Sequence, residues 1–138
     1  MKVCIVGNGL VSIALAKALV NKGIYVDLFS NQKINKIDKS RTIGISKTNI
    51  DFFNKNILNI NKFLWKIKKI EVFSDNLKNE KLLNFKTDSE NLFSILKNAD
   101  LYNYLFVNLK KSIFFKLLGN ESLISLKKYN LIINCDTT

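Results

Sequence analysis

The sequence predicts an α/β fold in which a parallel sheet is combined with a small antiparallel β insertion. Two observations support this prediction. Within residues 1–30, a strand-like run, a glycine-rich turn, an apolar helical run and a second strand-like run follow one another, which is the order of a βαβ unit. Within about residues 64–97, two strand-like runs are joined by a polar link, as in an antiparallel pair.

The N-terminal unit has a distinct local pattern for each of its elements. The run "KVCIV" at 2–6 is apolar and β-branched, as in a buried strand. The run "LVSIALAKALVNK" at 10–22 is an almost wholly apolar helix that ends at Gly23, a residue typical of a C-terminal cap. The run "IYVDLFS" at 24–30 then predicts the second strand.

The loop "VGNGLVS" at 6–12 joins the first strand to the helix. Gly7 permits a tight turn, Gly9 lets the backbone approach a pyrophosphate, and Ser12 is small enough for close packing of the helix on the strand. The backbone N–H groups at the helix start attract phosphate oxygens. The pattern therefore predicts a Rossmann-like nucleotide site formed by Gly7, Asn8, Gly9, Leu10, Val11 and Ser12.

Two residues beyond this loop are candidate ligands of the same nucleotide. Ser30 ends the second strand, where an acidic residue normally binds the ribose hydroxyls, and it offers a neutral hydroxyl instead. Arg41 is the only arginine in the chain. Because a guanidinium binds phosphate or carboxylate through a planar set of donors, this single arginine indicates a geometric requirement. The alternative is a chance surface arginine.

The elements that follow extend the predicted fold. The run "RTIGIS" at 41–46 precedes a helix with apolar residues at Ile50, Phe53 and Ile57. The runs "IKKIEVFS" and "KLLNFK" supply the antiparallel pair. We expect Trp65 and the phenylalanines to serve as core residues or as cover for this hairpin.

The last third of the chain predicts a helix and two returning strands. Leu101, Leu105 and Leu109 are four residues apart and define one helix face. The runs "SIFFKLL" and "LIINC" then complete the parallel sheet. With no histidine, no paired carboxylates and two cysteines in apolar runs, the sequence predicts no catalytic residue and no metal site.

Composition restricts the choice of partners and compartment. The net charge of +11 accompanies 21 lysines, 19 asparagines and 17 isoleucines spread along 138 residues. We interpret this as compositional bias, because a nucleic-acid surface would cluster its cations on one face. No specific nucleic-acid partner is expected. Cys4 and Cys135 suit reduced core positions, and the uncharged run 3–16 is too short for a membrane span. A cytoplasmic protein is expected.

Taken in order, these motifs resemble the flavin-dependent aromatic hydroxylases, and within them the ubiquinone-biosynthesis hydroxylases. Asp38 followed by "RTIGIS" is similar to a "DxRTxALS" segment, and "LWKIKKIEVFSD" at 64–75 is similar to a "PIxxIxVxD" strand. The run "LKNADLYNYL" at 96–105 resembles the start of a family helix, and "YNLIINCD" at 129–136 resembles the strand that leads into a "GADG" motif. The resemblance runs through nearly the whole chain, although no single motif is intact.

The resemblance implies FAD as the cofactor, NAD(P)H or another electron donor as co-substrate, and a small aromatic or quinone-type substrate. It implies that the pyrophosphate lies on the loop from Gly7 to Ser12, with Arg41 beside it and Asp136 near the ribityl-phosphate side. In such enzymes the cofactor activates oxygen, while the protein positions the flavin and excludes water. Peripheral contact at the inner membrane face is left open.

Several departures from the family pattern limit this expectation. Leu10 stands where proline is common, Ser30 replaces the acid, and "NCDT" retains only Asp136 of "GADG". The family's second FAD motif and most of its substrate domain lie further downstream. We therefore expect 1–138 to be an incomplete FAD-binding domain that is inactive alone, with a helix and returning strands in 98–138. A degenerate nucleotide-binding or interaction module, and a basic binder of nucleic acid or anionic lipid, stay open as alternatives.

Overall fold

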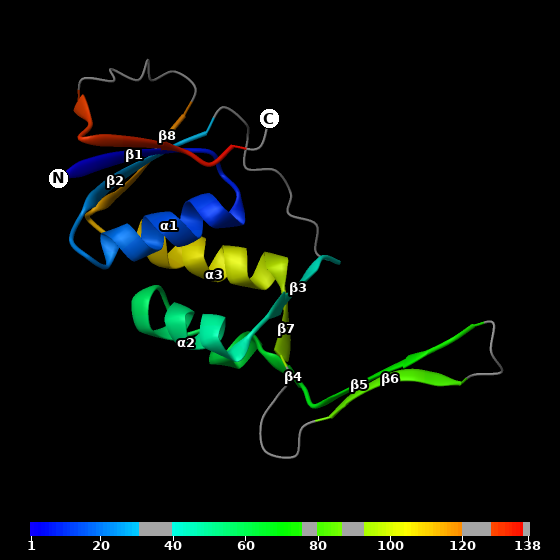
Figure 1. The fold of residues 1–138 in the computed structure, drawn as a ribbon. Coiled ribbons are helices and arrows are strands. Elements are labelled where there is room, and N and C mark those ends of the chain that lie inside the picture. Colours follow the sequence, from blue (N-terminus) through cyan, green and yellow to red (C-terminus); the bar gives the residue numbers. More distant parts are fainter. Residues whose placement is uncertain (31–39, 76–79, 87–92, 120–127, 137–138) are drawn as a thin grey trace.

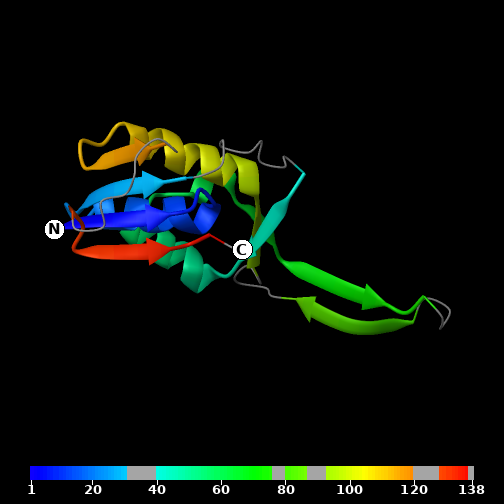
Figure 2. The ribbon, with the colours of Figure 1, turned by 90° about the horizontal axis from the view of Figure 1, so that it is seen from above.

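The computed structural model describes five stretches of the chain, namely residues 1–30, 40–75, 80–86, 93–119 and 128–136. Their strands form three separate sheets. Figure 1 shows a main body in which helices pack on a sheet, and a two-stranded ribbon that projects from this body. Figure 2, seen from above, shows the same ribbon extending away from the other elements.

The main sheet is parallel throughout, in the spatial order β8-β2-β1-β9. Its strands are β1 (Lys2–Val6), β2 (Tyr25–Phe29), β8 (Phe115–Leu118) and β9 (Leu131–Asn134). The central strands are mainly apolar and most of their residues are buried, with Asp27 of β2 as the buried charged exception. The predicted α/β fold, with a parallel sheet and an antiparallel insertion, is confirmed.

Two helices cover one face of this sheet, α1 (Leu10–Val20) and α3 (Asn98–Lys110) (Figure 1). Ile13 of α1 and Leu105 of α3 are fully buried in the core between helices and sheet. Gly23, at φ +72°, follows the end of α1, as the predicted C-terminal glycine should. None of the described helices is long and apolar enough to cross a bilayer.

A second, antiparallel sheet lies beside the start of α3, in the order β3-β7-β4. Its strands are β3 (Thr42–Ile45), β7 (Phe93–Lys97) and β4 (Trp65–Ile67). The short helix α2 (Lys47–Asn56) follows β3 and is capped by the Ser46 hydroxyl, which accepts from the Asn49 N–H at 3.3 Å. The 3₁₀ turn Asn61–Phe63 precedes β4.

Two details of this sheet differ from the sequence-based expectations. The run "FSILK" at 93–97 falls within the predicted annexe but was not assigned to a strand, and it forms the central strand β7. Trp65, which we expected in the core or as cover, is 68% exposed, so that expectation is wrong. Its face of the sheet is opposite to the face that buries Leu96, because paired residues share a face and neighbours along a strand alternate.

The projecting ribbon consists of β5 (Lys69–Phe73) and β6 (Lys81–Lys86), paired antiparallel. The register places Ile70 opposite Phe85 and Val72 opposite Leu83, so that one face of the ribbon is apolar. The opposite face is charged, and its Glu71 carboxylate is paired with the ammonium groups of two lysines, Lys69 and Lys81. An isolated two-stranded ribbon is marginal in water, and here its apolar face is largely exposed.

A partly buried polar cluster joins β1, β2 and the segment before β9. The Asp27 side chain is 8% exposed, lies 2.7 Å from the Lys2 ammonium and accepts a 2.8 Å hydrogen bond from the Tyr129 hydroxyl. Burial, together with this bond to a carboxylate, raises the pKa of the Tyr129 phenol well above its ordinary value. Cys4 is buried nearby and Cys135 is half-buried, and both thiols are free.

We predict that Tyr129→Phe lowers the free energy of unfolding by about 1–2 kcal/mol at pH 7, because it removes the donor to a buried carboxylate. The measurement is urea denaturation followed by circular dichroism. Since the folded pKa of Tyr129 is raised, the stabilisation is complete below the unfolded value of about 10 and is lost as pH rises further. The difference between parent and variant should therefore shrink in strong alkali.

The matched control is Tyr25→Phe, the same substitution at a half-exposed tyrosine whose ring contacts Phe114. It should leave stability within about 0.5 kcal/mol of the parent. Equal effects of the two substitutions would contradict the assigned role of the Tyr129 hydroxyl.

Candidate functional site

The turn after β1 has room only for glycine at position 7. Gly7 has φ +116°, a backbone conformation that L side chains rarely adopt, and its N–H donates to the Phe29 carbonyl at 2.8 Å. A Cβ atom at this position would lie 3.0 Å from the Asp136 nitrogen and 3.0 Å from the Ser12 hydroxyl oxygen. The turn therefore brings the ends of β1 and β9 against the first turn of α1.

The start of α1 is open to a ligand. Gly9 is the extended N-cap residue, with φ −72° and ψ 174°, and no side chain caps the helix. A Cβ atom at Gly9 would meet nothing within 4 Å, so the backbone is accessible from that side. The first-turn N–H groups of a helix have no partner within the helix, and they carry a partial positive charge. This is the arrangement that binds phosphate groups.

Ser12 and Asp136 lie behind this turn. Ser12 is fully buried, and its hydroxyl has no hydrogen-bond partner among the described residues. Asp136 follows β9, and its N–H donates to the Asn134 side-chain oxygen at 3.0 Å. The preceding Cys135 N–H donates to the Val6 carbonyl at 2.8 Å, which fixes the end of β9 beside the end of β1. Polar groups from three elements thus converge on Gly7.

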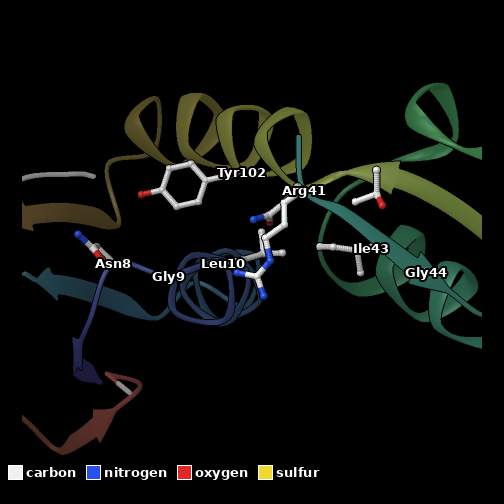
Figure 3. A pocket seen from close by; sticks show the side chains of 9 residues that line it. Asn8, Gly9, Leu10, Arg41, Ile43, Gly44 and Tyr102 are labelled. Carbon is white, nitrogen blue, oxygen red and sulfur yellow. The ribbon is translucent and has the colours of Figure 1, made fainter. Parts of the chain in front are cut away.

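A cavity of about 610 Å³ lies beside the turn, between the start of α1, the start of α3 and the strand β3. Its walls come from the turn, the beginning of β3 and the first turns of α3, and they are formed by Asn8, Gly9, Leu10, Arg41, Thr42, Ile43, Gly44, Asn98 and Tyr102. Figure 3 shows the Arg41 side chain reaching from the start of β3 toward the side of the cavity formed by Leu10. The volume is in the range of about 300–1,000 Å³ that is usual for ligand sites.

One backbone hydrogen bond holds the two far walls of this cavity together. The Asn98 N–H, at the start of α3, donates to the Arg41 carbonyl at 2.9 Å. The Asn98 side-chain oxygen is buried and has no partner within the described ranges. A buried acceptor without a partner is uncommon and requires a donor from elsewhere. It is therefore available to a ligand that donates hydrogen bonds.

Arg41 is the only charged residue among the described residues of the cavity wall, and no described carboxylate forms an ion pair with it. The positive guanidinium and the start of α1 give the cavity a potential that favours anions. On the opposite wall, burial raises the pKa of the Tyr102 phenol. Tyr102 therefore stays neutral at physiological pH and can donate a hydrogen bond into the cavity.

The residues predicted for the site fall into three groups. Four of them line the cavity: Asn8, Gly9, Leu10 and Arg41. Three lie behind the turn: Gly7, Ser12 and Asp136. Two are placed elsewhere, since Ser30 is buried at the end of β2 and Val11 is 70% exposed on α1.

Two further cavity residues, Asn98 and Tyr102, were not recognised as site residues from the sequence. They lie in the first turns of a helix that follows a strand end, a position that often carries ligand contacts. That signal was hidden because β7 was not recognised. Asp38, part of the family resemblance, lies outside the described residues. Among the described residues, no three histidine, cysteine or acidic side chains gather as metal ligands would.

No protein-family model and no curated protein matches this sequence. Solved structures do match, and three are representative. The first is p-nitrophenol 4-monooxygenase PnpA from Pseudomonas putida DLL-E4, with a TM-score of 0.70 and 15% identity over 86% of this chain and 31% of that chain. The second is P. aeruginosa PqsL in complex with 2-aminobenzoylacetate, with a TM-score of 0.67 and 16% identity over 86% of this chain and 33% of that chain. The third is Klebsiella pneumoniae HpxO complexed with FAD and uric acid, with a TM-score of 0.64 and 17% identity over 85% of this chain and 30% of that chain.

At these identities the comparisons establish the fold and no more. The neighbours include a named monooxygenase and a protein with bound FAD, as expected for the predicted FAD-binding fold. The chain spans about a third of the length of these structures. What the longer proteins bind and catalyse is not transferred to this chain by similarity of fold alone.

The geometry of the turn predicts a large effect of substitution by alanine at Gly7 and a small one at Gly9. Gly7→Ala should lower the free energy of unfolding by roughly 1–3 kcal/mol, because the methyl group meets the Asp136 backbone in a strained conformation. Gly9→Ala should change stability by less than about 0.5 kcal/mol, because its conformation is ordinary and its surroundings are open. Urea denaturation measures both. A stability loss at Gly9 equal to that at Gly7 would contradict this description of the turn.

Proposed function

We propose that this chain is the N-terminal FAD-binding part of a flavin-dependent monooxygenase that hydroxylates an aromatic or quinone precursor. The observation that carries the proposal is the 610 Å³ cavity, in which an open glycine turn at a helix start faces the only arginine of the chain. Neither the glycine turn nor the arginine alone indicates a dinucleotide site. Together they offer two independent groups for the two phosphates of a pyrophosphate.

The residues present fit FAD at this position. The space beside Gly9 is open where a pyrophosphate would approach the backbone, and the N–H groups of α1 are uncapped. Arg41 supplies the positive charge that a diphosphate requires. On the far wall, the unpartnered Asn98 oxygen and the neutral Tyr102 hydroxyl suit the hydroxyl groups of a ribityl chain.

Bound FAD would supply the oxygen-activating redox chemistry, which the protein's own side chains do not provide. The chain's own residues would bind the cofactor and orient it. Arg41 and the start of α1 would hold the pyrophosphate, while Leu10 and Ile43 provide an apolar wall that would displace water. Because the Asn98 backbone N–H donates a hydrogen bond to the Arg41 carbonyl, the position of the arginine is coupled to the start of α3. A ligand that contacts both walls therefore meets a preformed site.

Finer parts of the proposal rest on the sequence resemblance. They are the ubiquinone-biosynthesis branch, NAD(P)H or another electron donor, and a cytoplasmic location with peripheral contact at the inner membrane face. The division into a βαβ phosphate-binding unit at 1–30, an antiparallel annexe at about 64–97 and a helix with returning strands at 98–138 is likewise part of the proposal. Ser30 in place of an acid keeps a binding module without catalysis as the competing function.

The test of binding is an amide NMR titration of the chain with FAD. We expect resonance shifts at the residues of the turn, at Arg41 and at Asn98, even where the affinity of the chain alone is weak. Gly9→Val should abolish these shifts, because a branched side chain fills the space that the pyrophosphate needs. Gly119→Val is the matched control, since Gly119 also has nothing within 4 Å but lies outside the cavity wall. Shifts that persist in Gly9→Val would contradict the assigned binding mode.

A second prediction concerns the arginine. Arg41→Lys should weaken FAD binding roughly tenfold, equivalent to ~1.4 kcal/mol, because an ammonium cannot reproduce the planar pair of donors. Arg41→Gln should weaken it further, since the charge is removed as well. Isothermal titration calorimetry with FAD in a longer protein that contains this domain gives the affinities. An unchanged affinity in both variants would assign Arg41 to an ordinary surface position.

A further inference from the structure

A second cavity lies on the other side of Thr42 from the first. Its volume is about 210 Å³, and it is lined by Thr42, Lys62, Phe63, Trp65, Ile95, Leu96, Lys97 and Asp100. Thr42 is shared with the larger cavity, so the two spaces are neighbours. None of the lining residues apart from Thr42 belongs to the site described above.

Part of the wall of this second cavity is one face of the β3-β7-β4 sheet, while Leu96 belongs to the opposite face. The register pairs Trp65 with Ile95 and Thr42 with Lys97, and Ile95 and Lys97 are two residues apart on β7. Because paired residues share a face and alternate residues along a strand do the same, these four side chains share one face. Trp65 is the only tryptophan of the chain and is 68% exposed on that face. A large, rigid aromatic surface is thus presented beside the cavity.

Two lysines give this cavity a positive edge. The Lys62 ammonium lies 4.0 Å from the centroid of the Tyr104 ring and 4.9 Å from that of the Phe63 ring, which holds it at the cavity wall. Lys97 is exposed at the end of β7. Neither lysine forms an ion pair with a carboxylate of the described chain. Both positive charges are therefore available to an anion.

The one acidic residue among the described lining residues of the cavity does not cancel these charges. Asp100 lies in the first turn of α3, where a carboxylate interacts favourably with the helix dipole. Two ammonium groups against one such carboxylate leave the cavity net positive. Its volume is below the range of about 300–1,000 Å³ for drug-sized ligands. A single ring fits these dimensions, whereas a nucleotide does not.

We propose that this second cavity binds a small, single-ring aromatic carboxylate, stacked on Trp65 with its carboxylate toward Lys62 and Lys97. Stacking on an exposed indole selects a planar ring, and the two ammonium groups select the negative charge. The inference deepens the proposed function by giving its aromatic ligand a place next to the flavin cavity. It rests on that function only for the role of the ligand as substrate, not for its binding.

The test is an NMR titration of the whole 138-residue chain with benzoate, in which the single indole N–H resonance of Trp65 is followed. We expect a saturable shift of this resonance with benzoate, and a much smaller response to benzyl alcohol, which lacks the charge, and to cyclohexanecarboxylate, which lacks the planar ring. Lys97→Gln should weaken benzoate binding about two- to fivefold, as expected for one exposed charge. The double variant Lys62→Gln and Lys97→Gln should weaken it further.

Lys110→Gln is the matched control, because Lys110 lies at the other end of α3 with its ammonium 4.6 Å from the Phe106 ring. It should leave benzoate binding unchanged. An absence of saturable shift, an equal response to benzyl alcohol, or an equal loss in Lys110→Gln would each overturn the proposal.

Gly9→Val separates the two proposals, since it should abolish FAD binding and leave benzoate binding intact. Benzoate binding without FAD binding would refute the proposed function alone.

Discussion

The rest of the site depends on the close approach of three backbones at Gly7. With φ +116° and no side chain, this residue lets β1 turn into α1 while the segment after β9 passes within contact distance. The backbone bonds from Gly7 to Phe29 and from Cys135 to Val6 then fix the strand ends on both sides. As a result, the open start of α1 lies at the carboxyl edge of the parallel sheet, where open α/β sheets bind their ligands.

The second sheet completes the site from outside the βαβ unit. Its strand β3 begins next to Arg41, and the hydrogen bond from Asn98 to Arg41 ties that strand to α3, which packs on the main sheet beside α1. The arginine is thereby held across the cavity from the glycine turn. The same sheet also carries Trp65 on its exposed face. One small sheet thus forms a wall of both cavities, with Thr42 between them.

Charge and apolar surface are distributed unevenly over the described chain. The partly buried cluster of Asp27, Lys2 and Tyr129 lies at the main sheet and concerns stability, because its groups satisfy the buried Asp27 carboxylate. The projecting ribbon keeps an exposed apolar face at Leu83 and Phe85. We interpret the net charge of +11 as largely a matter of composition. Arg41 and the two lysines of the second cavity, which form no ion pair with a described carboxylate, are the positive groups that line a proposed site.

The sequence by itself determined the βαβ unit, its glycine turn and the parallel sheet, because these depend on local periodicity and on the conformations that glycine allows. It did not determine β7, the cavity contacts of Asn98 and Tyr102, or the exposure of Trp65. These were decided by antiparallel pairing between residues that are 26 (Ile67 and Phe93) to 55 (Thr42 and Lys97) positions apart in sequence. Pairing over such distances sets which face of each strand is buried, and a short strand carries too few residues to encode that choice alone.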